Sequence, residues 1–164
     1  MATTWNTNNT IGGTQQNLST SYKTLVNVYA TTGALQRTYV SSLHVGANAA
    51  PNSTDCPIQV DVSLMTAEGT ATTLTPLAMN ATLETGTIAG PRSTSKGNHT
   101  AEPTVTSNST RLARAFNQRG YLYWVAMDDQ HMIVGPAVAN NGWVLRAQSP
   151  NYASTCVGEI QFQE

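Results

Sequence analysis

The sequence predicts an all-β protein, built as a single antiparallel β-sandwich with a jelly-roll-like arrangement of strands. Three observations support this fold class. Apolar and polar residues alternate with a period of two along much of the chain, no segment keeps a 3.6-residue period over three turns, and Gly, Pro and Asn clusters interrupt the pattern at short intervals. The length of 164 residues suits one domain, and a hydrophobic content of 40% supplies a core.

The clearest strand is "PIQVDVSLMT" at residues 57–66, in which every second residue from Ile58 to Leu64 is a large aliphatic one. The "AEG" that follows at residues 67–69 predicts a hairpin turn into a second strand at residues 70–75. The same alternation gives about eight or nine strands in all. The others are expected at residues 23–31, 37–45, 110–118, 120–127, 131–134, 143–149 and 156–163.

Other segments lack this alternation. Residues 1–20 are expected to form a polar N-terminal arm, and residues 21–164 the sandwich. Residues 86–104 contain few groups that could pack, which predicts a long surface loop, and residues 76–85 could hold one short helical turn. Trp5 is the large apolar side chain of the arm. We expect it to dock on a neighbouring protein surface, and the alternative is that it folds back onto its own sandwich.

A tight turn is expected just before the strand that begins at Trp143. Its sequence, Asn140, Asn141 and Gly142, is typical of turns with positive backbone φ.

One strand carries an unusual concentration of aromatic residues for a chain with 7% aromatic content. If "GYLYWVAM" at residues 120–127 is a strand, its side chains divide between two faces. One face carries Tyr121, Tyr123, Val125 and Met127, and the other carries Leu122, Trp124 and Ala126. We expect Trp124 to lie in the core and the tyrosine face to be covered by a loop or another subunit. A ligand platform built from the two tyrosines is the alternative.

Charge is scarce: only 10% of the residues are Asp, Glu, Lys or Arg, and the net charge is -1. The polar surface comes instead from 25 Thr, 14 Asn and 12 Ser. Such surfaces repel one another weakly, which favours an assembled protein. The eight basic residues are scattered, which argues against a nucleic-acid partner. No secretory signal and no run of roughly 20 apolar residues is present, so no membrane association is expected.

The sequence lacks the patterns of common catalytic and metal sites. The three histidines lie far apart and near no Cys or acidic pair at ligand spacing, so no metal is expected. Asp128 and Asp129 suit a solvated turn, and no calcium-loop spacing follows them. There is no Gly-x-Ser-x-Gly elbow and no Gly-rich phosphate loop. We therefore expect a protein that is not an enzyme and uses no cofactor.

Two further sets of residues could have special roles. Arg111, Arg114 and Arg119 form the densest basic group, and a solvated or subunit-bridging role is expected, with an anion site as the alternative. Cys56 and Cys156 are expected to be reduced, partly buried thiols, and a single disulfide bridge is the alternative.

Four segments carry a family resemblance. They are "NHTAEPT", "ARAFNQRGYLYWVAM", "VGPAVANNGWVLRAQSPNY" and the closing "GEIQFQE". Together they resemble a family of small tailed-bacteriophage virion proteins, over roughly 100 residues, and these motifs specify a fold better than an activity. The front half fits more loosely, and this chain has "PLAMNATLE" where the family often has a Pro-rich stretch.

The resemblance implies a capsid decoration (cement) protein on the exterior of the virion, assembled in the host cytoplasm. Its partners would be the major capsid protein and further copies of itself, as a homotrimer on a three-fold axis. Trp5, Arg111, Arg119, Tyr121 and Tyr123 are the expected assembly contacts, with Trp5 docking on a neighbouring subunit or on the shell.

Two other functions remain open. One is a head-fibre or tail-tip module that binds host surface glycans, and the other is a lectin-like domain with no phage link. Exposed aromatic side chains would stack on sugar rings, and Tyr29, Tyr39, Trp143 and Tyr152 are the candidates. A glycan binder would bind sugar alone, whereas a cement protein would bind only an assembled capsid.

Overall fold

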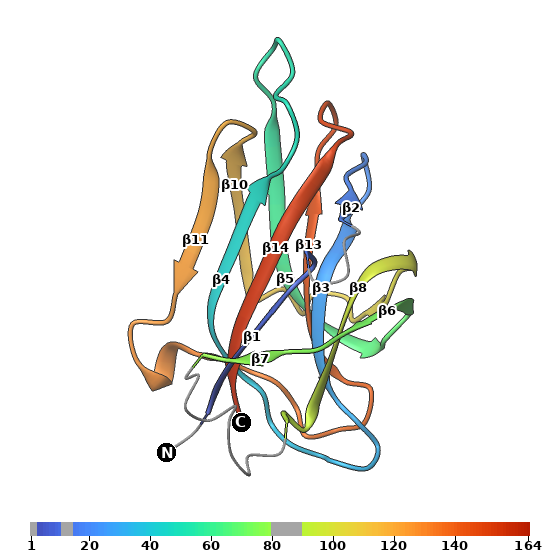
Figure 1. The fold of residues 1–164 in the computed structure, drawn as a ribbon, viewed down its shortest axis with the longest axis vertical. Coiled ribbons are helices and arrows are strands. Elements are labelled where there is room, and N and C mark those ends of the chain that lie inside the picture. Colours follow the sequence, from blue (N-terminus) through green and yellow to red (C-terminus); the bar gives the residue numbers. More distant parts are fainter. Residues whose placement is uncertain (1–2, 11–14, 80–89) are drawn as a thin grey trace.

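The computed structural model of the protein describes residues 3–10, 15–79 and 90–164 and confirms the antiparallel β-sandwich (Figure 1). Sheet A contains β1 (Thr4–Asn8), β2 (Gln16–Asn17), β4 (Tyr39–Ala47), β7 (Leu77–Ala78), β11 (Tyr121–Val125), β12 (Ile133–Val134) and β14 (Thr155–Gln163). Sheet B contains β3 (Lys23–Ala30), β5 (Pro57–Ala67), β6 (Thr70–Leu74), β8 (Ser93–Ala101), β9 (Thr104–Val105), β10 (Leu112–Asn117) and β13 (Gly142–Gln148). The only helical element in the described residues is a 3-10 turn, η1 (Asp129–His131).

The strand order is that of a jelly roll. The long strands β1, β14, β4 and β11 lie side by side in sheet A, and β3, β13, β5 and β10 lie side by side in sheet B. The chain therefore crosses between the sheets as it passes from β3 to β4 to β5, and again from β10 to β11 to β13 to β14. This alternation between two four-stranded layers confirms the jelly-roll-like expectation. A pair of extra strands, β8 and β6, extends sheet B beyond β3.

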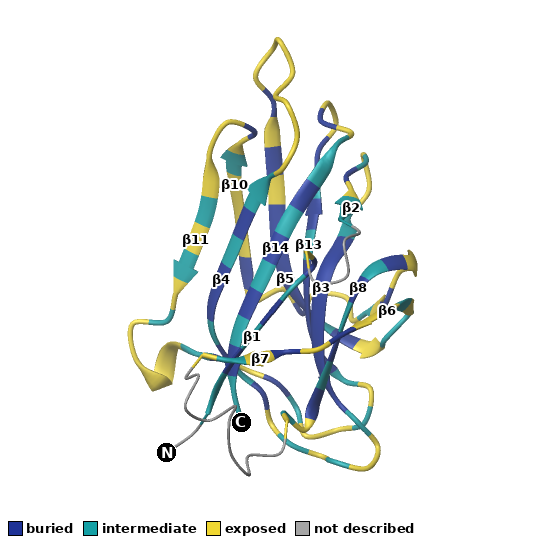
Figure 2. Cartoon of the chain, in the orientation of Figure 1, coloured by how far each residue is buried: buried dark blue, intermediate teal, exposed yellow. Residues whose placement is uncertain are grey.

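The core lies between the two sheets and follows the alternation seen in the sequence. Along β14 every second residue is buried, as it is along β1, so each strand gives one side to the interior (Figure 2). The strands β3 and β13 are buried on almost every residue because they lie in the middle of sheet B. The fully buried large side chains of the core include Tyr152, Phe162, Leu25, Leu43, Ile58, Leu145 and Ile160.

The N-terminal segment is part of the sandwich, which corrects the expectation of a separate arm at residues 1–20. Strand β1 lies between β14 and β7, with Thr4 opposite Gln163 and Asn8 opposite Glu159. Trp5 is 7% exposed and belongs to the core of its own chain. The sequence did not indicate this strand because its composition is polar. Only one of the two inward positions of β1 carries a large apolar group, Trp5, and the other is Thr7.

A second correction concerns residues 86–104, which were expected to form a surface loop. Residues 93–101 form the nine-residue strand β8, paired with β3 on one side and β6 on the other. Its inward positions are Ser93, Ser95, Gly97 and His99, so the strand carries no hydrophobic alternation to detect. Residues 80–89, which include part of the expected helical turn at 76–85, lie outside the described residues, and Leu77–Ala78 form β7.

A buried polar network takes the place of apolar packing under β8. Asn27 on β3 lies at its centre. Its Oδ1 accepts a 2.8 Å hydrogen bond from the backbone N–H of Lys96, and its Nδ2 lies 3.2 Å from Nε2 of the buried His99. The Ser95 hydroxyl donates to the carbonyl of Asn27 at 2.8 Å and lies 2.7 Å from the hydroxyl of Thr7. These bonds satisfy groups that would otherwise be costly to bury.

The turn at residues 67–69 exists, but it does not close the expected hairpin. Gly69 has φ +71°, and a side chain there would meet the carbonyl oxygen of Ala101 at 2.3 Å, so this position requires glycine. The strand that follows, β6, pairs with β8 and not with β5. The turn therefore carries the chain to the opposite end of sheet B.

The turn before Trp143 lies where the sequence predicted it, for a different reason. The residue with positive φ is Asn140, at 63°, whereas Gly142 already begins β13. A Cβ at Gly142 would lie 2.1 Å from the carbonyl oxygen of Val28 and 2.5 Å from Cα of Tyr29 on β3. Glycine is needed at this position because the backbone of β3 passes too close for any side chain.

Candidate functional site

The strongest candidate site is an exposed stripe along β11, the edge strand of sheet A. A short turn delivers the chain from β10 in sheet B to β11 in sheet A. In this turn the N–H of Gly120 donates to the carbonyl of Asn117 at 2.8 Å, and the side-chain oxygen of Asn117 accepts from the N–H of Arg119 at 2.9 Å. Strand β11 then pairs with β4, with Tyr121 opposite Gly46 and Tyr123 opposite His44.

The side chains of β11 divide between two faces as the sequence predicted, but no described part of the chain covers the tyrosine face. Leu122 and Trp124 are half-buried and pack against the core. The other face is open to solvent, as the exposed bands along β11 in Figure 2 show. It carries Tyr121 (68% exposed), Tyr123 (60%), Val125 (51%) and, just beyond the strand, Met127 (82%). We call these four residues the β11 stripe. Exposed apolar groups in a contiguous row are typical of contact surfaces.

His44 on β4 fixes the position of the two tyrosine rings. Its ring lies 5.5 Å from the ring of Tyr121 and 6.3 Å from that of Tyr123, measured between centroids. The interplanar angles are 75° and 78°, so both contacts are edge-to-face. The sequence alone did not indicate His44, because it lies more than 70 residues before β11 and only the pairing of β11 with β4 brings them together. The ring of His44 therefore packs against both tyrosines of the stripe.

The two arginines expected as assembly contacts lie apart. Arg119 lies at the start of β11, where its Nε donates to Oδ1 of Asp55 at 2.6 Å and its guanidinium also reaches the carbonyl of Asn52 at 3.0 Å. The hydrogen bond from Arg119 lowers the pKa of the exposed Asp55 carboxyl. Arg111 precedes β10, and its guanidinium carbon lies 6.0 Å from the ring of the buried Trp143. Only Arg119 adjoins the stripe.

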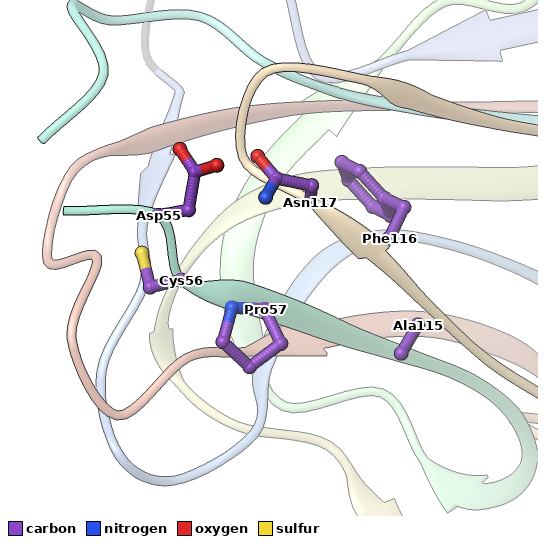
Figure 3. A pocket seen from close by; sticks show the side chains of 6 residues that line it. All are labelled: Asp55, Cys56, Pro57, Ala115, Phe116 and Asn117. Atoms are coloured by element: carbon purple, nitrogen blue, oxygen red, sulfur yellow. The ribbon is translucent and has the colours of Figure 1, made fainter.

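An open hollow of about 350 Å³ lies next to the β10–β11 turn (Figure 3). Its lining comes from the start of β5 and the end of β10, namely Asp55, Cys56, Pro57, Ala115, Phe116 and Asn117. Cys56 is 3% exposed, and the described lining of the hollow contains no histidine that could act as a base for the thiol. The carboxylate of Asp55 is already paired with Arg119. The hollow therefore offers little chemistry beyond shape.

The remaining expected site residues are covered. Trp5 lies in the core of its own chain and is not available for a partner. Of the four aromatic residues considered for sugar stacking, Tyr29, Trp143 and Tyr152 are buried, which corrects that expectation, and Tyr39 is half-buried. The exposed aromatic rings of the stripe are Tyr121 and Tyr123, so any stacking surface on β11 would have to use those two.

The titratable groups outside the stripe form no metal centre. Within residues 3–10, 15–79 and 90–164, no group of three or more His, Cys, Asp or Glu side chains could hold a metal ion. Asp128 forms the expected solvated turn, where it accepts from backbone N–H groups of η1 and pairs with His131 at 2.7 Å. Cys56 and Cys156 are both free and buried, which confirms the expected reduced thiols, and burial raises the pKa of Cys156 to about 12.

No helix among the described residues is long and apolar enough to cross a membrane. Comparison of the chain with models of protein families, with curated proteins and with solved structures finds no match.

Proposed function

We propose that the protein is a non-enzymatic structural component of a tailed-bacteriophage virion, a capsid decoration protein that binds the exterior of the assembled head. The observation that carries the proposal is the β11 stripe, a row of exposed aromatic and aliphatic side chains on a rigid sandwich edge. Tyr and Met are enriched at protein–protein interfaces, and the stripe itself carries no charge that burial would penalise. The proposed location on a virion rests on the resemblance to small virion proteins. The jelly roll is also a fold that viral capsid proteins use.

The composition supports the same proposal. A protein bound to a shell in many copies must tolerate close neighbours, and a surface with 10% charged residues and a net charge of -1 permits this. The contact with the major capsid protein stays a prediction, and so does self-association, for which the sequence analysis expected a homotrimer. The glycan-binding alternative is not favoured, because three of its four candidate aromatic residues are buried.

The test is direct labelling of particles. Antibody raised against this chain, coupled to gold, is applied to purified virions of the phage that encodes it and viewed by electron microscopy. We expect labels distributed over the head, and purified protein should rebind to heads stripped of it. Label confined to the tail, or binding of the isolated protein to oligosaccharides on a glycan array, would overturn the decoration proposal in favour of host recognition.

A further inference from the structure

The open edge of sheet A has a row of backbone groups with no partner strand among the described residues. Strand β11 pairs only with β4 there. Just after the strand, the N–H of Ala126 donates to the carbonyl of Ser41 at 2.8 Å, in the same register as the pairs within β11. Because antiparallel strands alternate between bonded and non-bonded pairs, the residues that share this phase direct their N–H and C=O groups toward β4. Tyr121, Tyr123 and Val125 have the opposite phase, so their N–H and C=O groups point outward, away from β4.

This edge lacks the features that normally keep a sheet edge from pairing with another chain. The segment Tyr121–Val125 has no proline and no charged residue, and its pairing with β4 shows no bulge. Its side chains are aromatic, branched or aliphatic, which are the types that strands favour. The three residues that present free backbone groups are also the three strand residues of the β11 stripe, so backbone and side chains are open at the same positions.

We propose that two copies of the chain pair through β11, in antiparallel register, about a two-fold axis at Tyr123. In this register Tyr123 lies opposite Tyr123 of the second copy, and Tyr121 lies opposite Val125. All three are outward-bonding residues, so the backbone groups of the two edges match without a shift. Aromatic pairs and aromatic–β-branched pairs across strands are both stabilising. Two copies of sheet A would then form one continuous sheet.

The charges beyond the strand ends do not oppose a second copy. The segment before β11 carries Arg119, and the segment after it carries Asp128. Antiparallel pairing brings the first segment of one copy toward the second segment of the other, so the ends bring opposite charges together and not like ones, although Arg119 is already paired with Asp55 and Asp128 with His131 in each chain. Within the paired region itself no like charges face each other, since Tyr121–Val125 is uncharged. The edge can therefore meet a second copy without charge repulsion, and its outward backbone groups supply the attraction.

This inference names a partner for the backbone edge of β11 and leaves the side-chain face of the stripe open, so it rests on the proposed function only in treating this strand as a place of contact between proteins. It predicts a dimer in place of the expected trimer, because a two-fold axis through one edge closes after two copies. It can be tested on purified protein without any capsid. Labelling of virions and pairing in solution can therefore fail independently of each other.

Register-specific crosslinking is the first test. In Y123C, the two introduced thiols face each other across the axis, so a thiol-to-thiol crosslinker shorter than about 10 Å should give a covalent dimer. Y121C alone should not crosslink, because its two copies would lie about 14 Å apart along the strand. A mixture of Y121C with V125C should crosslink. Wild type controls for the buried Cys56 and Cys156, and T72C on the exposed edge strand β6 controls for random collision.

The mass of the native protein is the second test. Light scattering after gel filtration should report a dimer for wild type, and Y123K should shift it to a monomer because two like charges would meet at the axis. The far-UV circular dichroism of Y123K should match that of wild type, since Tyr123 is exposed and its replacement leaves the sandwich folded, and T72K should stay dimeric. A wild-type monomer or trimer, or crosslinking of Y121C as strong as that of Y123C, would overturn the proposal.

Discussion

Arg146 on β13 lies directly opposite Asp61 on β5, and its Nε donates to Oδ1 of Asp61 at 2.8 Å while its terminal nitrogen reaches Oδ2. Both side chains are largely buried, at 19% and 6% exposure. The ring of Tyr22 covers the guanidinium, with its centroid 4.8 Å from the central carbon. The two strands at the centre of sheet B are therefore joined by an ion pair shielded from water.

Removal of one partner should be costly because the other charge is left buried without compensation. We expect D61A to lower the free energy of unfolding by about 3 kcal/mol. The double variant D61A/R146A should lose less than the sum of the two single variants. Urea denaturation of all four proteins measures this. The exposed pair of Asp55 and Arg119 is the matched control, and D55A should leave the urea midpoint unchanged within error. Additive losses at Asp61 and Arg146 would contradict the coupling.

A methyl group at Gly142 should disrupt the contact between β13 and β3. It would lie 2.1 Å from the carbonyl oxygen of Val28, which is backbone and cannot move without breaking the pairing. We expect G142A to destabilise the protein by about 2 kcal/mol or more. G33A is the control, because no atom lies within 4 Å of the Cβ position there. Equal melting temperatures for the two variants would show that β3 and β13 are not packed as described.

His99 should make the protein less stable as the pH falls from 7 to 5. Burial is the main reason that its pKa is lowered to about 4, from an ordinary value of 6.5. Between these two values the unfolded chain binds a proton that the folded protein does not, so the stability is complete above pH 6.5 and declines below it. The loss over this range should be about 2 kcal/mol.

The measurement is the free energy of unfolding in urea at both pH values. H99Q should show a smaller change between pH 7 and pH 5 than wild type, whatever its stability at pH 7. Carboxyl groups titrate mainly below this range and contribute little to it. An unchanged slope in H99Q would exclude His99 as the source.

Trp5 should contribute strongly to stability because it lies in the core between β14 and β7. We expect W5A to cost about 3 to 4 kcal/mol. The exposed Leu35, which lies outside the stripe, is the control, and L35A should change the free energy of unfolding by less than about 0.5 kcal/mol. If W5A melted like wild type, β1 would contribute little and the separate arm predicted from the sequence would regain support.

The sequence was sufficient where strands bury one apolar face. The alternation at residues 57–66 and 156–163 placed β5 and β14 within a few residues, and parity alone divided the side chains of β11 between two faces, although the tyrosine face, which was expected to be covered, is exposed in the single chain. It failed where the buried face is polar. In β8 the interior positions are Ser, Gly and His, and hydrogen bonds with Asn27 replace apolar contacts, so no periodicity was visible.

Pairing partners could not be predicted, because register depends on residues far apart in the chain. Nothing near Tyr123 in the sequence indicates that His44 lies beside it, and nothing near Gly69 indicates that β6 pairs with β8 and not with β5. For the same reason Tyr29, Trp143 and Tyr152 were open candidates for stacking until their burial was known. Composition showed which residue types the surface uses, and only the fold shows which aromatic rings are exposed.

The pairing of β1 with β14 sets the order in which the molecule can be completed. Thr4 has Gln163 as its partner, so β1 has no long neighbour in sheet A until β14 has been made. Sheet A therefore closes through contacts between residues that are very far apart in the sequence, and such folding is slow. Until β14 pairs with β1, Trp5 stays exposed, and the partly folded chain is then most prone to aggregation and to chaperone binding.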